Sequence, residues 1–126
     1  MLVLDSGGLS RLASRTRRSA ALIEAFRRHG VWPPVVPTVV IAESTSGKAR
    51  TDTNINQLLK ACDIDPIMSE HTARRAGQLR AAARRGSAVD ALVVALAEPG
   101  STVVTTDPDD LRALAAHSHN VTIETV

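Results

Sequence analysis

The chain has 126 residues, a mass of 13.4 kDa and a net charge of +2, with 44% apolar and 22% charged side chains. These values exclude intrinsic disorder and predict one folded domain, residues 1–126. The longest apolar run has seven residues, 91–97, whereas a membrane-spanning helix needs ~20, so we expect no membrane segment. We expect no signal peptide, and the single cysteine, Cys62, excludes an intrachain disulfide. These features indicate a cytoplasmic protein.

In the first half of the chain, apolar runs alternate with helical patterns. Leu2–Leu4 is predicted to form a buried strand that stops at a turn in residues 5–8. Residues 16–29 have apolar side chains at helical spacing, and Gly30 ends this helix. A short strand at residues 35–36 then precedes a helix that Thr38 caps and that runs to Ser46.

The second half continues the alternation. A short helix is predicted at 53–61, a proline-containing strand at 64–67, and an amphipathic helix with arginines on one face at 69–85. The segment from Ser87 to Ala97 is apolar on every side, which predicts a helix buried against a sheet. The remaining predicted elements are a strand at 102–105, a helix from Asp107 to about 116 and a strand at 121–123.

Strands that alternate with helices, and that read as short continuous apolar runs, are typical of an α/β fold. We therefore predict a single domain in which helices cover both faces of a parallel sheet. In such folds the functional site lies outside the carboxyl ends of the strands.

Four acidic residues stand out against this pattern. Asp5 and Asp107 follow predicted strands, whereas Glu43 and Asp90 lie in helices. Each acid has a structural explanation of its own. Asp5 and Asp107 are suited to turns or helix caps, Glu43 to an exposed helix face, and Asp90 to a capping box with Ser87.

The four acids together indicate a metal site. In a parallel α/β sheet all of them can point at one edge, and two like charges ~4 Å apart repel by ~4 kcal/mol at an effective dielectric near 20. A divalent cation removes that repulsion, and an all-oxygen set of ligands suits Mg²⁺ or Mn²⁺. The four histidines are scattered along the chain and lack zinc-ligand spacing.

The segments around these acids resemble the PIN-domain ribonucleases, and especially the VapC-type toxins of bacterial toxin–antitoxin pairs. The matching segments, which together span essentially the whole chain, are LVLDSGGL, VVIAES, SAVDALVVALA and VVTTDPDDL. Ser6 follows the first acid, as is usual in the family, and Thr105 and Asp107 fit the final motif. Gly7 and Gly8 depart from the serine or alanine that often stands there, which leaves the local turn geometry open.

The resemblance implies an endoribonuclease that hydrolyses RNA phosphodiester bonds with Mg²⁺ or Mn²⁺ as cofactor. The implied catalytic residues, which also form the metal site, are Asp5, Glu43, Asp90 and Asp107. Of these, Glu43 either binds the metal directly or holds a water molecule on it. The hydroxyls of Ser6 and Thr105 would orient carboxylates or water. The number of ions stays open, as does the question whether Asp109 or Asp110 shares the role of Asp107.

The basic residues predict contact with RNA. Thirteen of the fifteen are arginine, which suits bidentate phosphate contacts. They cluster at residues 11–18, 27–28 and 74–85, and we expect phosphate contacts from Arg11, Arg15, Arg84 and Arg85. The alternative is that they form solvated helix faces. With two aromatic residues in the chain, Phe26 and Trp32, a base-stacking surface is not expected.

The family resemblance also implies a homodimer and a cognate antitoxin. Phe26 and Trp32 are suited either to such an interface or to the core. Two other classes of function are alternatives. A signalling receiver domain needs a paired acid after its first strand and a lysine after a late strand, which this chain lacks. A catalytically inactive PIN-like domain that binds RNA or protein is the main alternative, although such a domain would be free to lose the four acids.

Overall fold

A computed structural model describes residues 1–66 and 68–126. Within these residues five parallel strands form one sheet, in the order β3-β2-β1-β4-β5. The strands are β1 (Leu2–Leu4), β2 (Val35–Pro37), β3 (Asp63–Asp65), β4 (Thr102–Thr105) and β5 (Thr122–Thr125). The parallel sheet predicted from the sequence is therefore confirmed.

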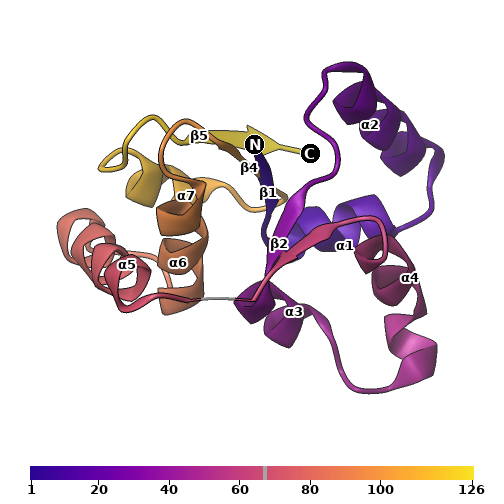
Figure 1. The fold of residues 1–126 in the computed structure, drawn as a ribbon, viewed down its shortest axis with the longest axis horizontal. Coiled ribbons are helices and arrows are strands. Elements are labelled where there is room, and N and C mark those ends of the chain that lie inside the picture. The colour runs from indigo at the N-terminus through magenta and orange to yellow at the C-terminus, as the bar shows by residue number, and fades with distance from the viewer. Residues whose placement is uncertain (67) are drawn as a thin grey trace.

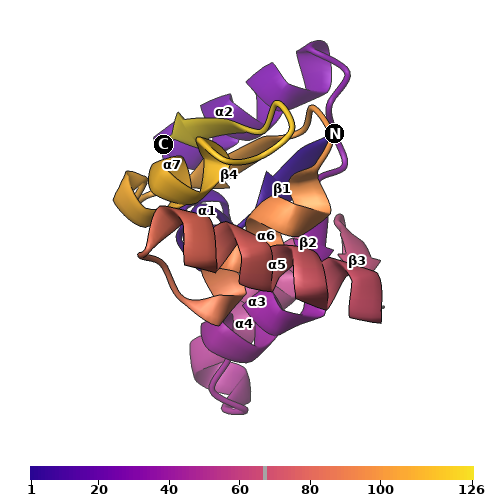
Figure 2. The same cartoon turned by 90° about the vertical axis from the view of Figure 1, so that its left-hand side faces the viewer.

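Helices cover both faces of this sheet (Figure 1). On one face lie α1 (Ser6–Ala13), α2 (Arg17–Arg28) and α4 (Ala49–Leu59). On the other lie α5 (Glu70–Ala83), α6 (Ala88–Ala97) and α7 (Asp109–Ala115), and Figure 2 shows α5 and α6 in front of the strands. The short helix α3 (Thr38–Ser44) follows β2 at the carboxyl ends of the strands. No helix of the described residues is long and apolar enough to cross a membrane.

The strand order reverses at β1. From β1 the chain adds β2 and then β3 on one side, and it later adds β4 and β5 on the other side. The carboxyl ends of β1 and β4 therefore lie side by side, with Leu4 paired to Val104. In open α/β sheets such a switch point forms a crevice between adjacent loops and is the usual ligand site.

The core lies on both sides of β1 and β4. Leu4, Val103 and Val104 are fully buried, and Leu9 of α1 and Val94 of α6 are buried as well. The prediction that the apolar segment 87–97 packs against the sheet is confirmed, since four residues of α6 are buried. This packing fixes the starts of α1 and α6 at the carboxyl edge of the sheet.

Residues 6–13 form helix α1, where only a turn at residues 5–8 was predicted. Two glycines in the first turn disfavour a helix by propensity. The packing explains them: a Cβ on Gly8 would collide with the carbonyl oxygen of Val104, and one on Gly7 with the hydroxyl of Thr106. Glycine therefore lets the start of α1 approach the backbone of β4.

We expect Gly8→Ala to lower the free energy of unfolding by ~1–3 kcal/mol, the usual cost of overpacking a rigid site. The colliding atom is a backbone oxygen, which cannot turn away as a side chain can. Chemical denaturation of the variant measures this change. Gly77→Ala is the control, because a Cβ there meets nothing within 4 Å.

Several predicted boundaries also shift. Helix α4 begins at Ala49 and not at residue 53, because the buried carboxylate of Asp52 accepts hydrogen bonds from the backbone of Ser46 and Gly47 and closes the preceding loop. Helix α3 begins at Thr38, so Pro37 and not Thr38 occupies the cap position. The third strand is Asp63–Asp65, paired with β2, and residue 67 of the predicted strand lies outside the described residues.

An ion pair ties the α5 side of the domain together. Arg75 of α5 donates two hydrogen bonds to Glu98 after α6, at 2.9 and 2.7 Å, and one to the carbonyl oxygen of His117. Glu98 also accepts the backbone N–H of His119 at 2.9 Å. The bonds from Arg75 lower the pKa of Glu98, despite the opposing effect of its burial.

We expect Glu98→Gln to lower the free energy of unfolding by ~1–3 kcal/mol at neutral pH, the range for hydrogen bonds to charged groups. A depressed carboxyl pKa stabilises the fold above the group's unfolded value, about 4.3, and this stabilisation is lost as the pH falls through the folded pKa. Denaturation of the wild-type chain and of Glu98→Gln at neutral and acidic pH measures the difference in their free energies of unfolding. A difference that persists in acid would contradict the ion pair as its cause.

Candidate active site at the carboxyl ends of the strands

Asp5 lies at the switch point between β1 and β4. Its backbone N–H bonds to the carbonyl oxygen of Val104 at 3.3 Å, and its Oδ1 accepts the N–H of Gly8 at 2.6 Å. The residue is 9% exposed. Asp5 is thus the N-cap of α1, and capping uses one of its two carboxylate oxygens.

The electrostatics of Asp5 show which other acids are near. Burial raises the pKa of Asp5, and the negative charges of Asp90 and Glu43 raise it further, whereas hydrogen bonds from Thr105 and Gly8 lower it. The charges of Glu43 on α3 and Asp90 on α6 therefore act on Asp5, which follows β1 at the carboxyl edge of the sheet. The repulsion of Asp5 by these two charges disfavours its ionised form in the folded chain.

Asp90 has the structural role that its sequence context predicts. Its backbone N–H bonds to Ser87 Oγ at 3.0 Å, and its Oδ2 accepts the N–H of Ser87 at 3.1 Å. This capping box starts α6. The same contacts hold the half-buried carboxyl group at the helix start, on the side of Asp5. Glu43 is exposed and lies one residue before the end of α3.

Asp107 lies in the exposed loop between β4 and α7, and the prediction that it caps α7 is wrong. Pro108 occupies the cap position, and no side chain caps the helix. The buried hydroxyl of Thr105 binds the backbone of Asp107 instead, accepting its N–H at 3.0 Å. Since Thr105 also bonds to Asp5, the loop that carries Asp107 begins next to Asp5.

Among the described residues, the four acids do not form a complete set of metal ligands. Within the described residues no three His, Cys, Asp or Glu side chains are close enough to hold a metal ion. Asp110, an alternative to Asp107, is engaged by Arg85, whose Nε lies 2.7 Å from Asp110 Oδ1. No local pattern in the sequence predicts this pair, since its partners are 25 residues apart. Ser6 is the half-buried first residue of α1.

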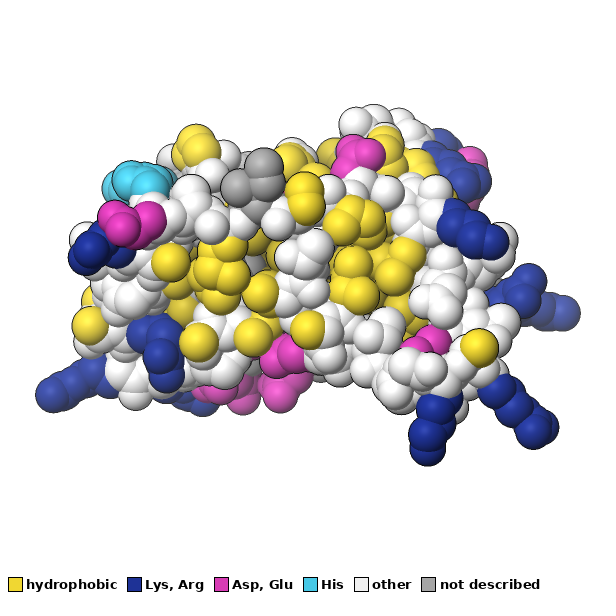
Figure 3. All heavy atoms as spheres, turned by 60° about the horizontal axis from the view of Figure 1, so that its bottom comes forward, with side chains coloured by type: hydrophobic (Ala, Val, Ile, Leu, Met, Phe, Trp, Pro, Cys, Tyr) yellow, Lys and Arg dark blue, Asp and Glu magenta, His cyan; other side chains and the backbone are white. Residues whose placement is uncertain are grey.

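The predicted RNA-binding arginines occupy two different places. Arg84 and Arg85 precede Gly86 and the capping box of α6 that holds Asp90. Arg11 lies in the last turn of α1, and Arg15 follows that helix, away from its start at Asp5. Figure 3 views the domain toward the carboxyl edge and shows acidic side chains gathered near its lower middle, with Lys and Arg side chains to both sides.

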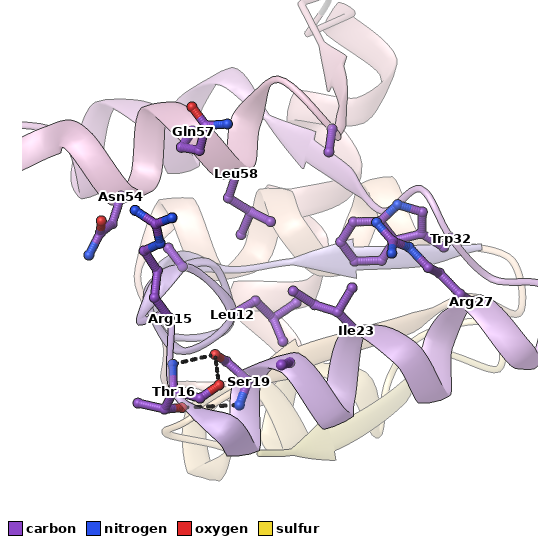
Figure 4. Close-up of a pocket in the computed structure, with 13 residues that line it drawn as sticks. Leu12, Arg15, Thr16, Ser19, Ile23, Arg27, Trp32, Asn54, Gln57 and Leu58 are labelled. Carbon is purple, nitrogen blue, oxygen red and sulfur yellow. Dashed lines mark hydrogen bonds between the residues drawn. The ribbon is translucent and has the colours of Figure 1, made fainter.

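A groove separates α4 from α1 and α2 on the face of the sheet that these helices cover (Figure 4). It has a volume of about 290 Å³ and a floor of apolar side chains that includes Leu12, Ile23 and Leu58. Arg15 lies at one end and Arg27 at the other, where its guanidinium stacks 5.3 Å from the centre of the Trp32 ring. Within the described residues neither arginine forms an ion pair.

Comparison with known proteins identifies the family. Residues 2–116 match the model of the PIN domain, and the chain therefore belongs to the PIN-domain family. A search of curated protein sequences found no match.

Solved structures share this fold. VapBC2 from Rickettsia felis, in a crystal structure with a DNA fragment from its promoter, has a TM-score of 0.73 at 15% identity, covering 99% of this chain and 98% of that one. FitAcB from Neisseria gonorrhoeae has a TM-score of 0.67 at 17% identity, covering 98% and 96%. PAE2754 from Pyrobaculum aerophilum has a TM-score of 0.62 at 16% identity, covering 97% and 89%.

Proposed function

We propose that this PIN-domain protein is a divalent-metal-dependent endoribonuclease and the toxin of a toxin–antitoxin pair. The observation that carries the proposal is the buried Asp5 at the β1–β4 switch point, with the charges of Asp90 and Glu43 acting on it. Membership of the PIN family supports nuclease activity. VapBC2 and FitAcB, which share the fold, are toxin–antitoxin complexes and support the toxin role.

The carboxylates suit a magnesium-type ion. Mg²⁺ typically keeps several water molecules and takes one or two carboxylates from the protein, so three converging ligands are not required in advance. Helix caps engage one oxygen each of Asp5 and Asp90, and a ligand needs only one oxygen. A bound Mg²⁺ or Mn²⁺ would activate water and stabilise charge on the scissile phosphate.

The chain's own residues have separate tasks in this proposal. Asp5 and Asp90, held by their caps, would bind the ion, and Asp107 would complete the site from its loop. Glu43 would be a further ligand or would orient water. The buried Thr105 positions Asp5 and the backbone of Asp107 through its hydroxyl, and Ser6 would orient a carboxylate or water at the start of α1.

The groove between α4 and α1–α2 is proposed to bind the antitoxin. Its apolar floor suits the apolar face of a helix, and its two unpaired arginines suit carboxylates at the ends of that segment. The groove opens on the side of the sheet where α1 leads back to Asp5. An antitoxin seated there could extend its chain over the acids and block them.

Two further properties belong to the proposal. The protein would act in the cytoplasm, where RNA is available to it. It would form a homodimer, for which the exposed Ile64 and Met68, 39% and 48% exposed, offer apolar surface. Sedimentation at several concentrations tests the dimer, and a monomer at every concentration would contradict it.

Expression in a bacterial host tests the function as a whole. Induction of the wild-type chain without a partner should arrest growth and create new RNA ends at defined sites, and Asp5→Asn should do neither. The main alternative function is that of a catalytically inactive PIN domain. The capping roles of Asp5 and Asp90 favour it, because such a domain would need these acids for its fold. Normal growth and unchanged RNA ends with the folded wild-type chain would favour that alternative.

A further inference from the structure

A basic cleft lies at the carboxyl end of α5, beside the acids. It has a volume of about 470 Å³, and three guanidinium groups line it, those of Arg80, Arg84 and Arg85. Gly77 lies one turn before Arg80 and also lines the cleft, with open space where its Cβ would be. The lack of a side chain at Gly77 keeps this part of the cleft open.

The three arginines differ in how they are engaged. Arg85 is committed to Asp110 of α7, at 2.7 Å. Arg80 reaches only the carbonyl oxygen of Gly86, at 3.4 Å, and Arg84 is exposed. Within the described residues neither Arg80 nor Arg84 forms an ion pair. Among the described residues, two positive charges of the cleft therefore lack a counterion.

Fold requirements explain only part of this arrangement. A cation in the last turn of a helix is favourable, which accounts for Arg80. Arg84, however, occupies the C-cap with a φ of +57°, a left-handed conformation in which glycine is the usual residue. A side chain there is more costly than glycine, so the cleft carries a guanidinium at a position where ending the helix does not require one.

The position of the cleft relates it to the acids. Gly86 directly precedes the capping box that holds Asp90, and the Arg85–Asp110 pair joins the cleft to the first turn of α7, two residues after Asp107. Figure 3 shows Lys and Arg side chains next to the acidic group on the side where α5 lies in Figure 1. The cleft is thus one neighbour of the proposed scissile position.

We infer that this cleft is a phosphate subsite, in which Arg80 and Arg84 hold a phosphodiester of the nucleic-acid strand next to the bond that is cut. The inference rests on the proposed function and adds a direction to it, since the strand would leave the acids along the end of α5. Guanidinium groups bind phosphate oxygens in pairs. The cleft would contact phosphates and not bases, and so it would position the strand without selecting its sequence.

Binding of a single-stranded poly-uridine RNA tests the subsite. The background is Asp5→Asn with a chelator, which stops cleavage and retains an oxygen acceptor for Gly8. In this background Arg80→Gln with Arg84→Gln should weaken binding and reduce the slope of log affinity against log salt by about 1.4, or ~0.7 for each lost phosphate contact. Gly77→Glu, which removes no arginine, should also weaken binding through the introduced carboxylate.

The matched control removes two positive charges elsewhere. Arg28→Gln with Lys60→Gln acts on exposed residues that precede β2 and β3, at the opposite edge of the sheet. This pair should leave the salt slope within ~0.3 of the parent value, less than half of one phosphate contact. In a parallel experiment, single-stranded DNA should lose affinity for the cleft variants to the same extent as RNA does, since both strands carry the same phosphodiester.

Three results would overturn the subsite. One is an equal loss of affinity in the cleft pair and the control pair, and another is an unchanged salt slope in the cleft variants. The third is a cleft pair that binds RNA normally but fails to bind the antitoxin, which would make the cleft a protein-docking site. RNA cleavage by the wild-type chain separates these failures from a failure of the proposed function. If the wild-type chain cleaves RNA but the cleft variants keep the parent salt slope, only the phosphate subsite is contradicted.

Discussion

Asp5→Asn should reduce metal-dependent RNA cleavage by at least ~10³-fold, because several kcal/mol of charge stabilisation are lost and each 1.36 kcal/mol changes the rate tenfold. The same variant should melt at a temperature higher by roughly 2–5 °C. Burial and the charges of Asp90 and Glu43 raise the pKa of Asp5, so its ionised form opposes folding at neutral pH. Asparagine removes that charge and retains the oxygen that accepts from Gly8.

The opposite signs of the two effects separate catalysis from folding. A mere loss of structure would lower both cleavage and melting temperature. Asp63→Asn is the matched control, since Asp63 is exposed at the start of β3, at the edge of the sheet away from the acids. Retained cleavage in Asp5→Asn would remove Asp5 from the metal site.

Ala20→Glu should weaken antitoxin binding by ~100-fold or more. Ala20 is an exposed residue of α2 that lines the groove, so the change leaves the core untouched. It fills part of the groove and places a carboxylate where we expect the partner's own acidic groups, and like charges in an interface cost several kcal/mol. Titration of the variant with the antitoxin that co-purifies with the wild-type chain measures the loss.

The control for the groove is the same substitution on another helix. Ala73 is exposed on α5, outside the groove, and Ala73→Glu should bind the antitoxin as the wild type does. Equal affinities of Ala20→Glu, Ala73→Glu and wild type would show that the antitoxin docks elsewhere. In that case Arg15 and Arg27 would not belong to an antitoxin site.

The sequence was sufficient where the pattern is local. Continuous apolar runs predicted the largely buried strands β1, β2 and β4, and the Ser87–Asp90 spacing predicted the capping box. Helix α1 was missed because propensity counts against two glycines, whereas the approach of α1 to Val104 requires them. That contact joins residues far apart in the chain, so no local signal announces it.

The site shows the same division. The order of the acids along the chain predicted one edge of the sheet for Asp5, Glu43, Asp90 and Asp107. In the structure the charges of Glu43 and Asp90 act on Asp5. Their catalytic roles stay predictions. The engagement of Asp110 by Arg85, the Thr105 contact with the Asp107 backbone and the shape of the groove depend on packing between distant segments. Such features become visible only when the fold is known.

The most direct test of the central claim is an in vitro cleavage assay. The purified wild-type chain, stripped of metal with a chelator and then dialysed, is incubated with single-stranded RNA alone, with Mg²⁺ and with Mn²⁺. We expect internal cuts only when a divalent cation is present, because the cation must relieve the repulsion among the carboxylates and activate water. Intact RNA under every condition, with a chain shown by its melting curve to be folded, would contradict the account.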